Sequence, residues 1–501
     1  MLREILGAFA SRQEAAIAAG VLAAEVLNGP MRRTKIVATI GPASNSREVI
    51  RQLVQAGMDV ARLNFSHGSY DQHAETIKNL REISKELDTP VTILQDLQGP
   101  KIRVGTLPGG EMKLPPGGVV AMLPEQDFTG QPDTLPLDYS HAAEEARAGM
   151  RILLDDGMMQ LEVLEIAGRA LRCRVLDGGV LKSRKGVNFP QLNLRLLPSL
   201  TEKDKEDLKF GVSQDVDWIS LSFVRSGSDV HILKELIAAQ GVFKPVVAKI
   251  EKPQAIENLD GILQETNGVM VARGDLGVEL NPEKVPMLQK HIIESCNRKG
   301  LPVITATQML ESMIRDPRPT RAEASDVANA IIDGTDAVML SGESAVGAHP
   351  VRAVEMMARI ASEVEAAITF KSYPAMGRGN AHALSEAAKV IASTIEPSCI
   401  VVLTTTGHTA HSIAAERPKT AVIAVARSKQ VYHALNLFWG LKPVLVDESP
   451  SDFEGLVKQA ESTVLARRLA QTGDKILVIG GVPAPSPLGA NFLKIHNVGS
   501  S

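Results

Sequence analysis

The sequence predicts an α/β protein: a (β/α)8 barrel with an inserted all-β lid domain and a C-terminal α/β domain. Eight short apolar runs alternate with segments of helical spacing, the pattern of parallel strands joined by crossover helices. The alternation stops after the third run, between residues 101 and 189, where Gly, Pro and short alternating stretches dominate. Beyond residue 373, strands and helices alternate again in a smaller unit.

Composition narrows the class of protein. The chain has 501 residues, which suits about three domains. Its 54 Lys and Arg against 58 Asp and Glu give a formal charge of -4, so we expect no nucleic-acid partner. Three widely spaced cysteines favour a reducing compartment, and we expect a cytoplasmic protein. No apolar run approaches the ~20 residues of a membrane span, so no membrane partner is expected.

Residues 1–30 are predicted to form an N-terminal extension, separate from the folded domains. They are rich in Ala and Leu with the spacing of a short surface helix. Glu4, Glu14 and Glu25 argue against a targeting peptide. Strong patterning starts only at Met31, so we expect the extension to be dispensable.

The barrel is predicted to occupy residues 31–100 and 190–370. Segments of helical spacing, such as Arg47–Ala56 and Val285–Lys299, separate its strands, and Thr201 is typical of a helix start. The expected strands are Lys35–Ile40, Val60–Phe65, Val91–Leu94, Trp218–Phe223, Val246–Ile250, Val269–Ala272, Pro302–Ala306 and Ala337–Leu340.

The other two domains are predicted from their strand patterns. Residues 101–189 are expected to form a small β-barrel, and residues 374–501 an α/β domain. The stretches that predict the first are Glu111–Pro116, Arg151–Leu154, Gln160–Ile166 and Leu171–Val175. Those that predict the second are the helix Ala383–Ile395 and the strands Cys399–Leu403, Ala421–Ala426, Pro443–Val446 and Lys475–Ile479.

Polar side chains follow six of the eight predicted barrel strands, which packing alone does not explain. In a (β/α)8 barrel the carboxyl ends of the strands meet at one mouth, where reactive groups gather. The residues are Arg62, Asn64, Ser66 and His67 after the second strand, Asp96 after the third, Lys249 and Glu251 at the fifth, Arg273 and Asp275 after the sixth, Thr305, Thr307 and Gln308 at the seventh, and Ser341 and Glu343 after the eighth.

Glu251 and Asp275 are the candidate metal ligands. They end adjacent strands, and two carboxylates suit a hard divalent cation that keeps waters and takes substrate oxygens. Lys249 lies two residues before Glu251, so strand alternation puts both on one face. There an ammonium can neutralise charge on a transferring phosphoryl group. The residues alone leave open two solvated acids and a lysine that only pairs with a carboxylate.

Two further features suit an anionic substrate. Arg62 can contact a phosphate with two parallel hydrogen bonds. The turn Arg273–Gly277 has two glycines before a helix and can offer backbone N–H groups to a carboxylate. Taken alone, an ordinary ion pair and an ordinary turn explain these residues equally well.

Seven segments, in the family's order, resemble the pyruvate kinase family. The similarity runs from about Arg33 to the C-terminus and is weaker in the insert and the last third. The segments are TKIVATIGPAS (34–44), ARLNFSHG (61–68), VAKIE (247–251), VARGDLGVE (271–279), ATQMLESM (306–313), RPTRAEASDV (318–327) and MLSGE (339–343). The resemblance implies a phosphotransferase that converts phosphoenolpyruvate and ADP to pyruvate and ATP, the last step of glycolysis. It also implies a mobile β lid, a C-terminal effector domain and a homotetramer.

The resemblance also implies roles for single residues. Glu251 and Asp275 would hold magnesium, or manganese in its place, while Lys249 would stabilise the transferring phosphoryl group and Arg62 would grip the phosphate. The other implied roles are the backbone of Ala272, Arg273, Gly274 and Asp275 for the substrate carboxylate, Thr307 beside the enolpyruvate carbon, Ser341 and Glu343 for its protonation, Pro42, His67, Arg103 and Lys185 on the nucleotide side, and the turn Asp155–Gly157 on the lid face.

The chain departs from the family pattern where many members bind potassium. Asn64, Ser66, Asp96 and the carbonyl of Leu97 match that site. Leu97 and Lys101, however, stand where potassium-dependent members usually have Thr and Glu. Because the ammonium of Lys101 can supply the charge that potassium otherwise brings, we expect activity without added potassium. A surface lysine without this role is the alternative.

A second departure lies in the predicted C-terminal domain. Thr404, Thr405, Thr406, Gly407, His408 and Thr409 resemble the family's phosphate-binding effector loop. Hydroxyls and a glycine turn before a helix suit an anion, so we expect a phosphorylated effector. His408 replaces the usual basic residue, and the Pro-rich stretch Gly480–Gly489 differs from the common sugar-bisphosphate loop. A helix cap without a ligand is the alternative.

Two other functions stay open. One is a magnesium-dependent aldolase of the pyruvate class, against which the insert and the C-terminal domain argue. The other is a catalytically silent metabolite sensor, because a fold alone never proves an activity. An assay with phosphoenolpyruvate and ADP, coupled to lactate dehydrogenase, separates all three.

Overall fold

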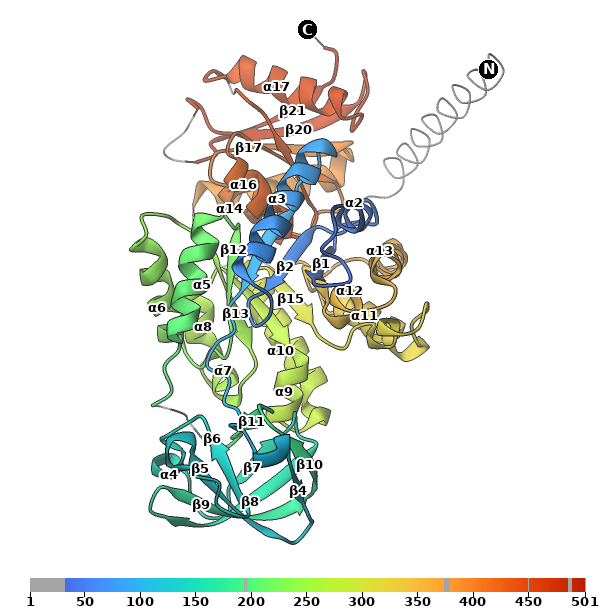
Figure 1. Cartoon of the computed structure of the whole chain (residues 1–501). Helices are drawn as coiled ribbons and strands as arrows, with labels where there is room; N and C mark the ends of the chain where they lie inside the picture. Colours follow the sequence, from blue (N-terminus) through green and yellow to red (C-terminus); the bar gives the residue numbers. More distant parts are fainter. Residues whose placement is uncertain are drawn as a thin grey trace, which may run out of the picture.

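The computed structural model describes residues 32–192, 194, 196–373, 379–448, 450–484 and 489–500. The C-terminal domain, the barrel and the insert follow one another along the long axis of the molecule (Figure 1). The extension predicted over residues 1–30 lies outside the described residues. In the described ranges, no helix is both long enough and apolar enough to cross a bilayer.

Eight parallel strands close into a barrel in the order β1-β16-β15-β14-β13-β12-β3-β2, which confirms the predicted architecture. Three strands have the predicted bounds, and the others differ by one or two residues at an end. The strands are β1 (Lys35–Ile40), β2 (Val60–Asn64), β3 (Thr92–Asp96), β12 (Trp218–Leu221), β13 (Val246–Ile250), β14 (Gly268–Ala272), β15 (Val303–Ala306) and β16 (Ala337–Leu340).

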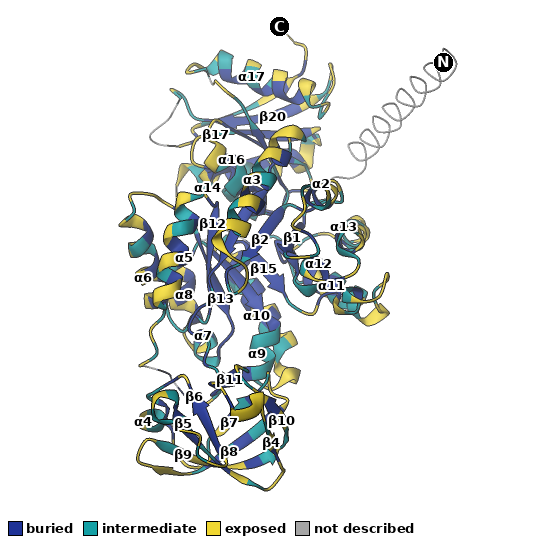
Figure 2. Ribbon diagram, in the orientation of Figure 1, coloured by how far each residue is buried: buried dark blue, intermediate teal, exposed yellow. Residues whose placement is uncertain are grey.

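Helices surround the barrel and bury one face against it, while their outer faces are exposed (Figure 2). Thr201, predicted to start a helix, is the N-cap of α5. Its hydroxyl accepts from the Asp204 N–H, and the Asp204 carboxylate accepts from the Thr201 N–H, so α5 begins with a capping box. The helices are α2 (Arg47–Gln55), α3 (Tyr70–Glu86), α5 (Glu202–Ser213), α6 (Gly227–Ala238), α7 (Pro253–Glu257), α8 (Leu259–Glu265), α9 (Arg273–Glu279), η3 (Pro282–Lys284), α10 (Val285–Arg298), η4 (Glu311–Ile314), α11 (Arg321–Ile332), α12 (Gly342–Ala345) and α13 (Pro350–Ala367).

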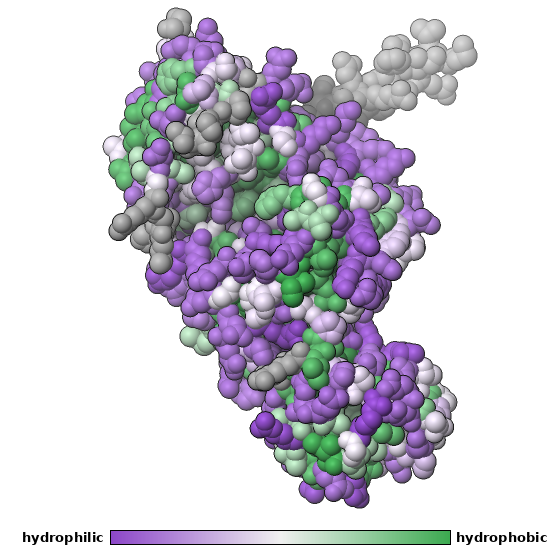
Figure 3. Space-filling view, turned by 90° about the vertical axis from the view of Figure 1, so that its left-hand side faces the viewer, coloured by the Kyte–Doolittle hydropathy of each residue, from purple (hydrophilic) through white to green (hydrophobic). Residues whose placement is uncertain are grey.

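The insert forms a separate lobe beyond the carboxyl ends of the barrel strands (Figures 1 and 3). It has a six-stranded sheet in the order β11-β7-β8-β9-β5-β6 and a two-stranded ribbon of β10 and β4. Single bridges from Val104 to Leu137 and from Arg103 to Gly186 link the two edges of the larger sheet. Its elements are η1 (Pro108–Gly110), β4 (Glu111–Leu114), β5 (Val119–Pro124), η2 (Glu125–Asp127), β6 (Thr134–Leu137), α4 (Ala142–Glu145), β7 (Arg151–Leu154), β8 (Met159–Ala167), β9 (Ala170–Asp177), β10 (Gly179–Lys182) and β11 (Val187–Asn188).

The C-terminal domain contains one five-stranded sheet, ordered β19-β18-β17-β20-β21. The four predicted strands are parallel, and the last strand, which the sequence did not predict, pairs antiparallel with β20. The elements are α14 (Asn380–Ile395), β17 (Cys399–Thr404), α15 (His408–Ala415), β18 (Val422–Ala426), α16 (Lys429–Ala434), η5 (Leu435–Leu437), β19 (Leu441–Leu445), α17 (Phe453–Ala466), β20 (Lys475–Gly480) and β21 (Phe492–Asn497).

This domain covers the amino-terminal end of the barrel. Leu437 of η5 packs in one buried cluster with inward-facing side chains of the barrel strands, among them Val37 and Trp218. The indole N–H of Trp218 donates to the Ala434 carbonyl at 3.1 Å, and the Lys35 ammonium donates to the Leu441 carbonyl at 2.7 Å. One end of the barrel is therefore covered by the C-terminal domain, and the other end faces the insert.

Candidate active site

Lys249 lies at the centre of a buried polar cluster at the insert-facing mouth of the barrel. Its position on β13 directs the ammonium into a group of oxygen atoms. The Nζ atom donates to Ser222 Oγ at 2.7 Å and lies 2.9 Å from Glu251 Oε1 and 3.4 Å from Asp96 Oδ1. The predicted pairing of Lys249 and Glu251 on one face of the strand is confirmed.

Electrostatics keep this lysine charged. Burial acts to lower the pKa of Lys249, but Asp96 and Glu251 outweigh it and raise that pKa above its ordinary value. Burial also acts to raise the pKa of Asp96, yet Lys249 and Arg62 hold it below the usual range. The site therefore presents a permanent cation at neutral pH, as charge neutralisation at a phosphoryl group requires.

Arg62 is anchored beside the same cluster. Its Nε donates to Asp96 Oδ2 at 2.7 Å, and its Nη1 donates to Thr39 Oγ1 at 2.9 Å. The sequence alone left an ordinary ion pair as the alternative for Arg62. The pair exists, but it fixes the guanidinium next to Lys249 at the barrel mouth.

Asp275 approaches the cluster from the adjacent strand β14, through the first turn of α9. Burial raises the pKa of Glu251, Lys249 opposes that rise, and the negative charge of Asp275 adds to it. Two carboxylates of like charge thus lie near enough for one to affect the other, and Glu251 is buried. Because a cation between them would remove this repulsion, the donor set fits the predicted divalent metal.

The number and type of side-chain ligands also indicate which kind of metal would bind. Among the described residues, no group of three or more His, Cys, Asp or Glu side chains could by itself hold a metal ion. Two carboxylates that leave positions for water and substrate oxygens suit magnesium better than a structural zinc site.

Residues Arg273–Gly277, predicted to form a turn before a helix, already belong to α9, and Thr307 and the Arg273 side chain hold its first turn. Thr307 Oγ1 accepts from the Gly274 N–H at 2.7 Å. The Arg273 guanidinium points away from the cluster, to the Thr307 carbonyl at 2.6 Å and Asp326 at 2.7 Å. The Arg273 side chain is thus engaged within the protein, and only the backbone of this residue is available for other contacts. Thr307 has a φ of 69°, a strained backbone for a threonine, which is common at functional sites.

Glu343 is buried and uses both carboxylate oxygens to hold backbone. Oε1 accepts from the Leu310 N–H at 3.0 Å, and Oε2 accepts from the Ser341 N–H at 2.8 Å. These bonds fix the loop after β15 against the end of β16. The predicted part of Ser341 and Glu343 in protonation stays a prediction, and the geometry gives Glu343 a positioning task.

Residues that match the potassium site already have hydrogen-bond partners within the protein. Asn64 Oδ1 accepts from the Ser66 N–H at 3.1 Å, and the Leu97 carbonyl accepts from Ser222 Oγ at 2.7 Å. Lys101 lies 3.8 Å from Asp156 Oδ1 of the insert rather than in contact with Asp96.

The predicted nucleotide-side residues fall on two domains. Arg103 and Lys185 belong to the insert, where Lys185 lies 2.8 Å from Asp155 Oδ1, and this carboxylate raises the pKa of the lysine. Pro42 and His67 are exposed on the barrel. Within the described residues, no hydrogen bond or ion pair joins these two groups, so their joint role is still a prediction.

The structure adds residues that the sequence argument missed. Ser222 donates to the Leu97 carbonyl and accepts from Lys249, and the Phe223 N–H donates to Glu251 Oε2 at 2.7 Å. Both follow β12, one of the two strands whose end was not considered. Thr39, at the end of β1, was missed in the same way. Their position in the sequence could have identified them, since any polar residue at the carboxyl end of a barrel strand is a candidate site residue.

The predicted effector loop forms a compact turn at the end of β17. The Gly407 N–H donates to Thr404 Oγ1 at 2.9 Å, and threonines of the loop border an open hollow that Arg427 also lines. A Cβ at Gly407 would lie 2.9 Å from Leu435, and its φ of 87° favours glycine, so this position requires one.

The barrel, the insert and the charged cluster between them define a phosphotransferase of the (β/α)8 class. Models of two domains match the chain: the barrel domain of pyruvate kinase over residues 31–354 and the pyruvate kinase alpha/beta domain over residues 382–496. The chain belongs to the pyruvate kinase family.

Individual relatives agree with this assignment. Pyruvate kinase 2 of Synechocystis sp. is 49% identical over 463 residues, which covers 90% of this chain and 76% of the relative. The pyruvate kinase of Sporosarcina psychrophila is 44% identical over 477 residues, which covers 94% and 81%. A crystal structure of a pyruvate kinase from Cryptosporidium parvum superposes with a TM-score of 0.87 at 35% identity, covering 93% of this chain and 96% of that one.

Proposed function

We propose that this enzyme transfers a phosphoryl group from phosphoenolpyruvate to ADP, with magnesium held by Glu251 and Asp275. One observation carries the proposal: Lys249 paired with Glu251 and Arg62 paired with Asp96 meet at the barrel mouth, with the carboxylate of Asp275 near enough to act on Glu251. Phosphoryl transfer needs charge neutralisation and positioning more than covalent help, and this cluster supplies both.

Each residue of the cluster has a task in this reaction. Magnesium, when bound, neutralises charge on the phosphoryl oxygens and orients them for in-line attack. Arg62 binds the phosphate, Lys249 stabilises the charge of the migrating group, and the backbone of residues 272–275 receives the substrate carboxylate. Ser222 and Phe223 position Lys249 and Glu251, and Thr307 would act beside the enolpyruvate carbon.

A coupled assay tests the proposal. With phosphoenolpyruvate, ADP and magnesium, lactate dehydrogenase should consume NADH at a rate proportional to enzyme, and Glu251→Gln should reduce that rate strongly. Ligand binding without ATP formation would support the silent sensor instead. Cleavage of a keto acid, with no turnover of phosphoenolpyruvate, would support the aldolase.

Activity is expected without potassium, because two oxygens that match the potassium site already accept hydrogen bonds and Lys101, which lines the cavity between insert and barrel, can supply a positive charge. We expect turnover in Tris or sodium buffer to rise less than tenfold when potassium is added. A tenfold rise would correspond to a fall of about 1.4 kcal/mol in the activation free energy. Lys101→Gln should lose activity in Tris and recover it with potassium, whereas Lys113→Gln, exposed in the insert, should behave as wild type. A larger potassium response of the wild type would contradict the prediction.

Regulation by a phosphorylated effector is proposed for the loop Thr404–Thr409. Four of its threonines and Arg427 border one hollow, and such a lining suits phosphate oxygens. A screen of sugar phosphates and nucleotides should find a compound that shifts the phosphoenolpyruvate dependence of the rate. Thr406→Glu, which adds a negative charge on an exposed residue, should abolish the shift and leave basal turnover unchanged. If no phosphorylated compound changes the rate or the melting temperature, the loop is only a helix cap.

A further inference from the structure

A buried carboxylate lies at the joint between the insert and the barrel. Glu279, the last residue of α9, accepts through Oε1 from Asn188 Nδ2 of the insert at 2.6 Å. The same oxygen forms an ion pair with Lys252. The side chains of Glu279 and Lys252 are only 1% and 10% exposed. We call Glu279, Lys252 and Asn188 the joint clamp.

The joint clamp connects the two segments that carry the candidate metal ligands. Asp275 precedes Glu279 by one turn of α9, so both side chains lie on the same face of that helix. Lys252 directly follows Glu251. The Lys252–Glu279 pair therefore fixes the distance between the segment of one carboxylate and the segment of the other.

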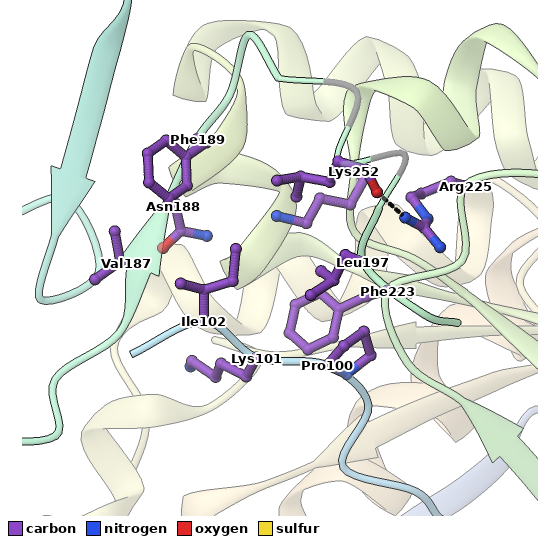
Figure 4. A pocket seen from close by; sticks show the side chains of 11 residues that line it. Pro100, Lys101, Ile102, Val187, Asn188, Phe189, Leu197, Phe223, Arg225 and Lys252 are labelled. Atoms are coloured by element: carbon purple, nitrogen blue, oxygen red, sulfur yellow. Dashed lines mark hydrogen bonds between the residues drawn. The ribbon is translucent and has the colours of Figure 1, made fainter. Parts of the chain in front are cut away.

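Phe223 links the joint clamp to Glu251 a second time. Its ring lies under the Lys252 ammonium, 5.4 Å from the ring centroid, while its N–H holds Glu251 Oε2 at 2.7 Å. Figure 4 shows Asn188, Lys252 and Phe223 around one cavity at this joint, with Asn188 coming from the insert and the other two from the barrel. A shift of the insert thus reaches Glu251 through two contacts.

The joint clamp is an inefficient way to stabilise the fold, because it buries a charged pair. A buried ion pair often contributes no more than apolar side chains of similar size. Glu279 Oε2 is also buried, with no hydrogen-bond partner among the described residues. Such an unsatisfied atom calls for an explanation other than packing.

We propose that Glu279 and Lys252 are positioning residues that hold Glu251 and Asp275 at the separation needed for one divalent cation. Asn188 connects the insert to the carboxylate of Glu279, so the docking of the insert on the barrel and the affinity for the cation are linked. Linkage is reciprocal, and cation binding should therefore stabilise the contact made by Asn188. The inference rests on the proposed metal site.

The test is a titration of the full-length protein with Mn²⁺ alone, with free Mn²⁺ followed by electron paramagnetic resonance. Glu279→Gln should weaken Mn²⁺ binding about tenfold or more, the size expected when a residue that helps to orient metal ligands is lost. Glu283→Gln is the matched control: it removes the same charge four residues further on, from an exposed side chain, and should stay within about twofold of wild type. Melting temperatures measured in parallel separate a binding effect from loss of fold.

Asn188→Ala tests the link to the insert. It removes one hydrogen bond and should weaken Mn²⁺ binding about threefold. In the wild type, Mn²⁺ should slow amide hydrogen exchange in β11, and this protection should disappear in Asn188→Ala. Equal protection in both proteins would overturn the link.

Each outcome decides between the clamp and the metal site. Wild-type Mn²⁺ affinity in a folded Glu279→Gln overturns the joint clamp and leaves the metal site intact. No Mn²⁺ binding by the wild type itself overturns both. If Glu279→Gln does not fold, Lys252→Met/Glu279→Met, which replaces the ion pair by apolar side chains, is titrated against the same criterion, alongside Asn188→Ala.

Discussion

At the scale of single residues, the site depends on charges placed where water is scarce. Lys249, Asp96 and Glu251 are all buried, so each would be costly without its neighbours. Their burial is tolerated because the positive charges of Arg62 and Lys249 compensate the negative charges of the carboxylates. Ser222 accepts a further hydrogen bond from Lys249. The ammonium of Lys249 is therefore held in one position by its neighbours, and such preorganised charge favours electrostatic catalysis.

Replacing Lys249 by Met should remove this cation while keeping much of the side-chain volume. We expect turnover to fall at least ~10³-fold, about 4 kcal/mol in barrier, because the charge of the migrating phosphoryl group loses its fixed partner. Steady-state kinetics with the coupled assay measure the loss. Lys209→Met, on the exposed side of α5, is the control and should keep full turnover; a loss below tenfold for Lys249→Met would contradict the role.

Much of this site could be predicted from the sequence, because strand alternation and strand ends fix where side chains point. Lys249 and Glu251 were placed together by that logic, and the structure brings their side chains to 2.9 Å. The direction of the Arg273 guanidinium could not be predicted, since it depends on Asp326, fifty-three positions along the chain. Nor could the contact of Lys101 with Asp156, which requires the insert to be docked.

At the scale of elements, all eight barrel strands were predicted, whereas in the insert β4, β7, β8 and β9 were predicted and β5, β6, β10 and β11 were not. Barrel strands are buried on both sides and read as continuous apolar runs. Strand β11 has only two residues and leaves too little pattern to recognise, and β6, with the sequence TLPL, is buried along its whole length and shows no alternation. The last strand, β21, is mostly exposed or half-buried, so its sequence FLKIHN lacks a clear apolar face.

Elements are also joined at the mouth by single side chains, and Glu343 is the clearest case. Its two oxygens hold the N–H groups of Leu310 and Ser341, which belong to the loop after β15 and the end of β16. In Glu343→Gln one oxygen becomes an NH₂ group that faces a donor, which should lower the free energy of unfolding by about 1–3 kcal/mol.

The same variant separates a positioning role of Glu343 from a part in protonation. If Glu343 only positions backbone, kcat should fall while the shape of its pH profile stays that of the wild type. A lost limb in the profile would show instead that the carboxylate transfers a proton. Urea unfolding and kcat measured across pH supply the two readouts, and Glu311→Gln, exposed at the start of η4, is the control.

At the scale of the whole molecule, the C-terminal domain is docked on the barrel through buried polar groups as well as apolar ones. Arg417 lies 3.1 Å from Asp336 and packs on Trp439, 4.7 Å from its ring centroid. His411 of α15 donates to the Gly300 carbonyl of the barrel and packs on Phe438. Since α15 begins at the proposed effector loop, this interface is the direct physical connection from that loop to the barrel.

This interface should weaken in acid. Burial lowers the pKa of His411 to about 4, whereas an unfolded histidine titrates near 6.5. Between these values the unfolded chain binds more protons, so stability is complete above pH 6.5 and falls as the pH drops toward 4. At pH 5 the loss from this residue should be about 2 kcal/mol. Urea unfolding at pH 7 and pH 5 measures it: His411→Gln should lose less stability than wild type by about that amount, while His231→Gln, at an exposed position, should match wild type. An equal acid loss in His411→Gln and wild type would show that this histidine is not held neutral at the interface.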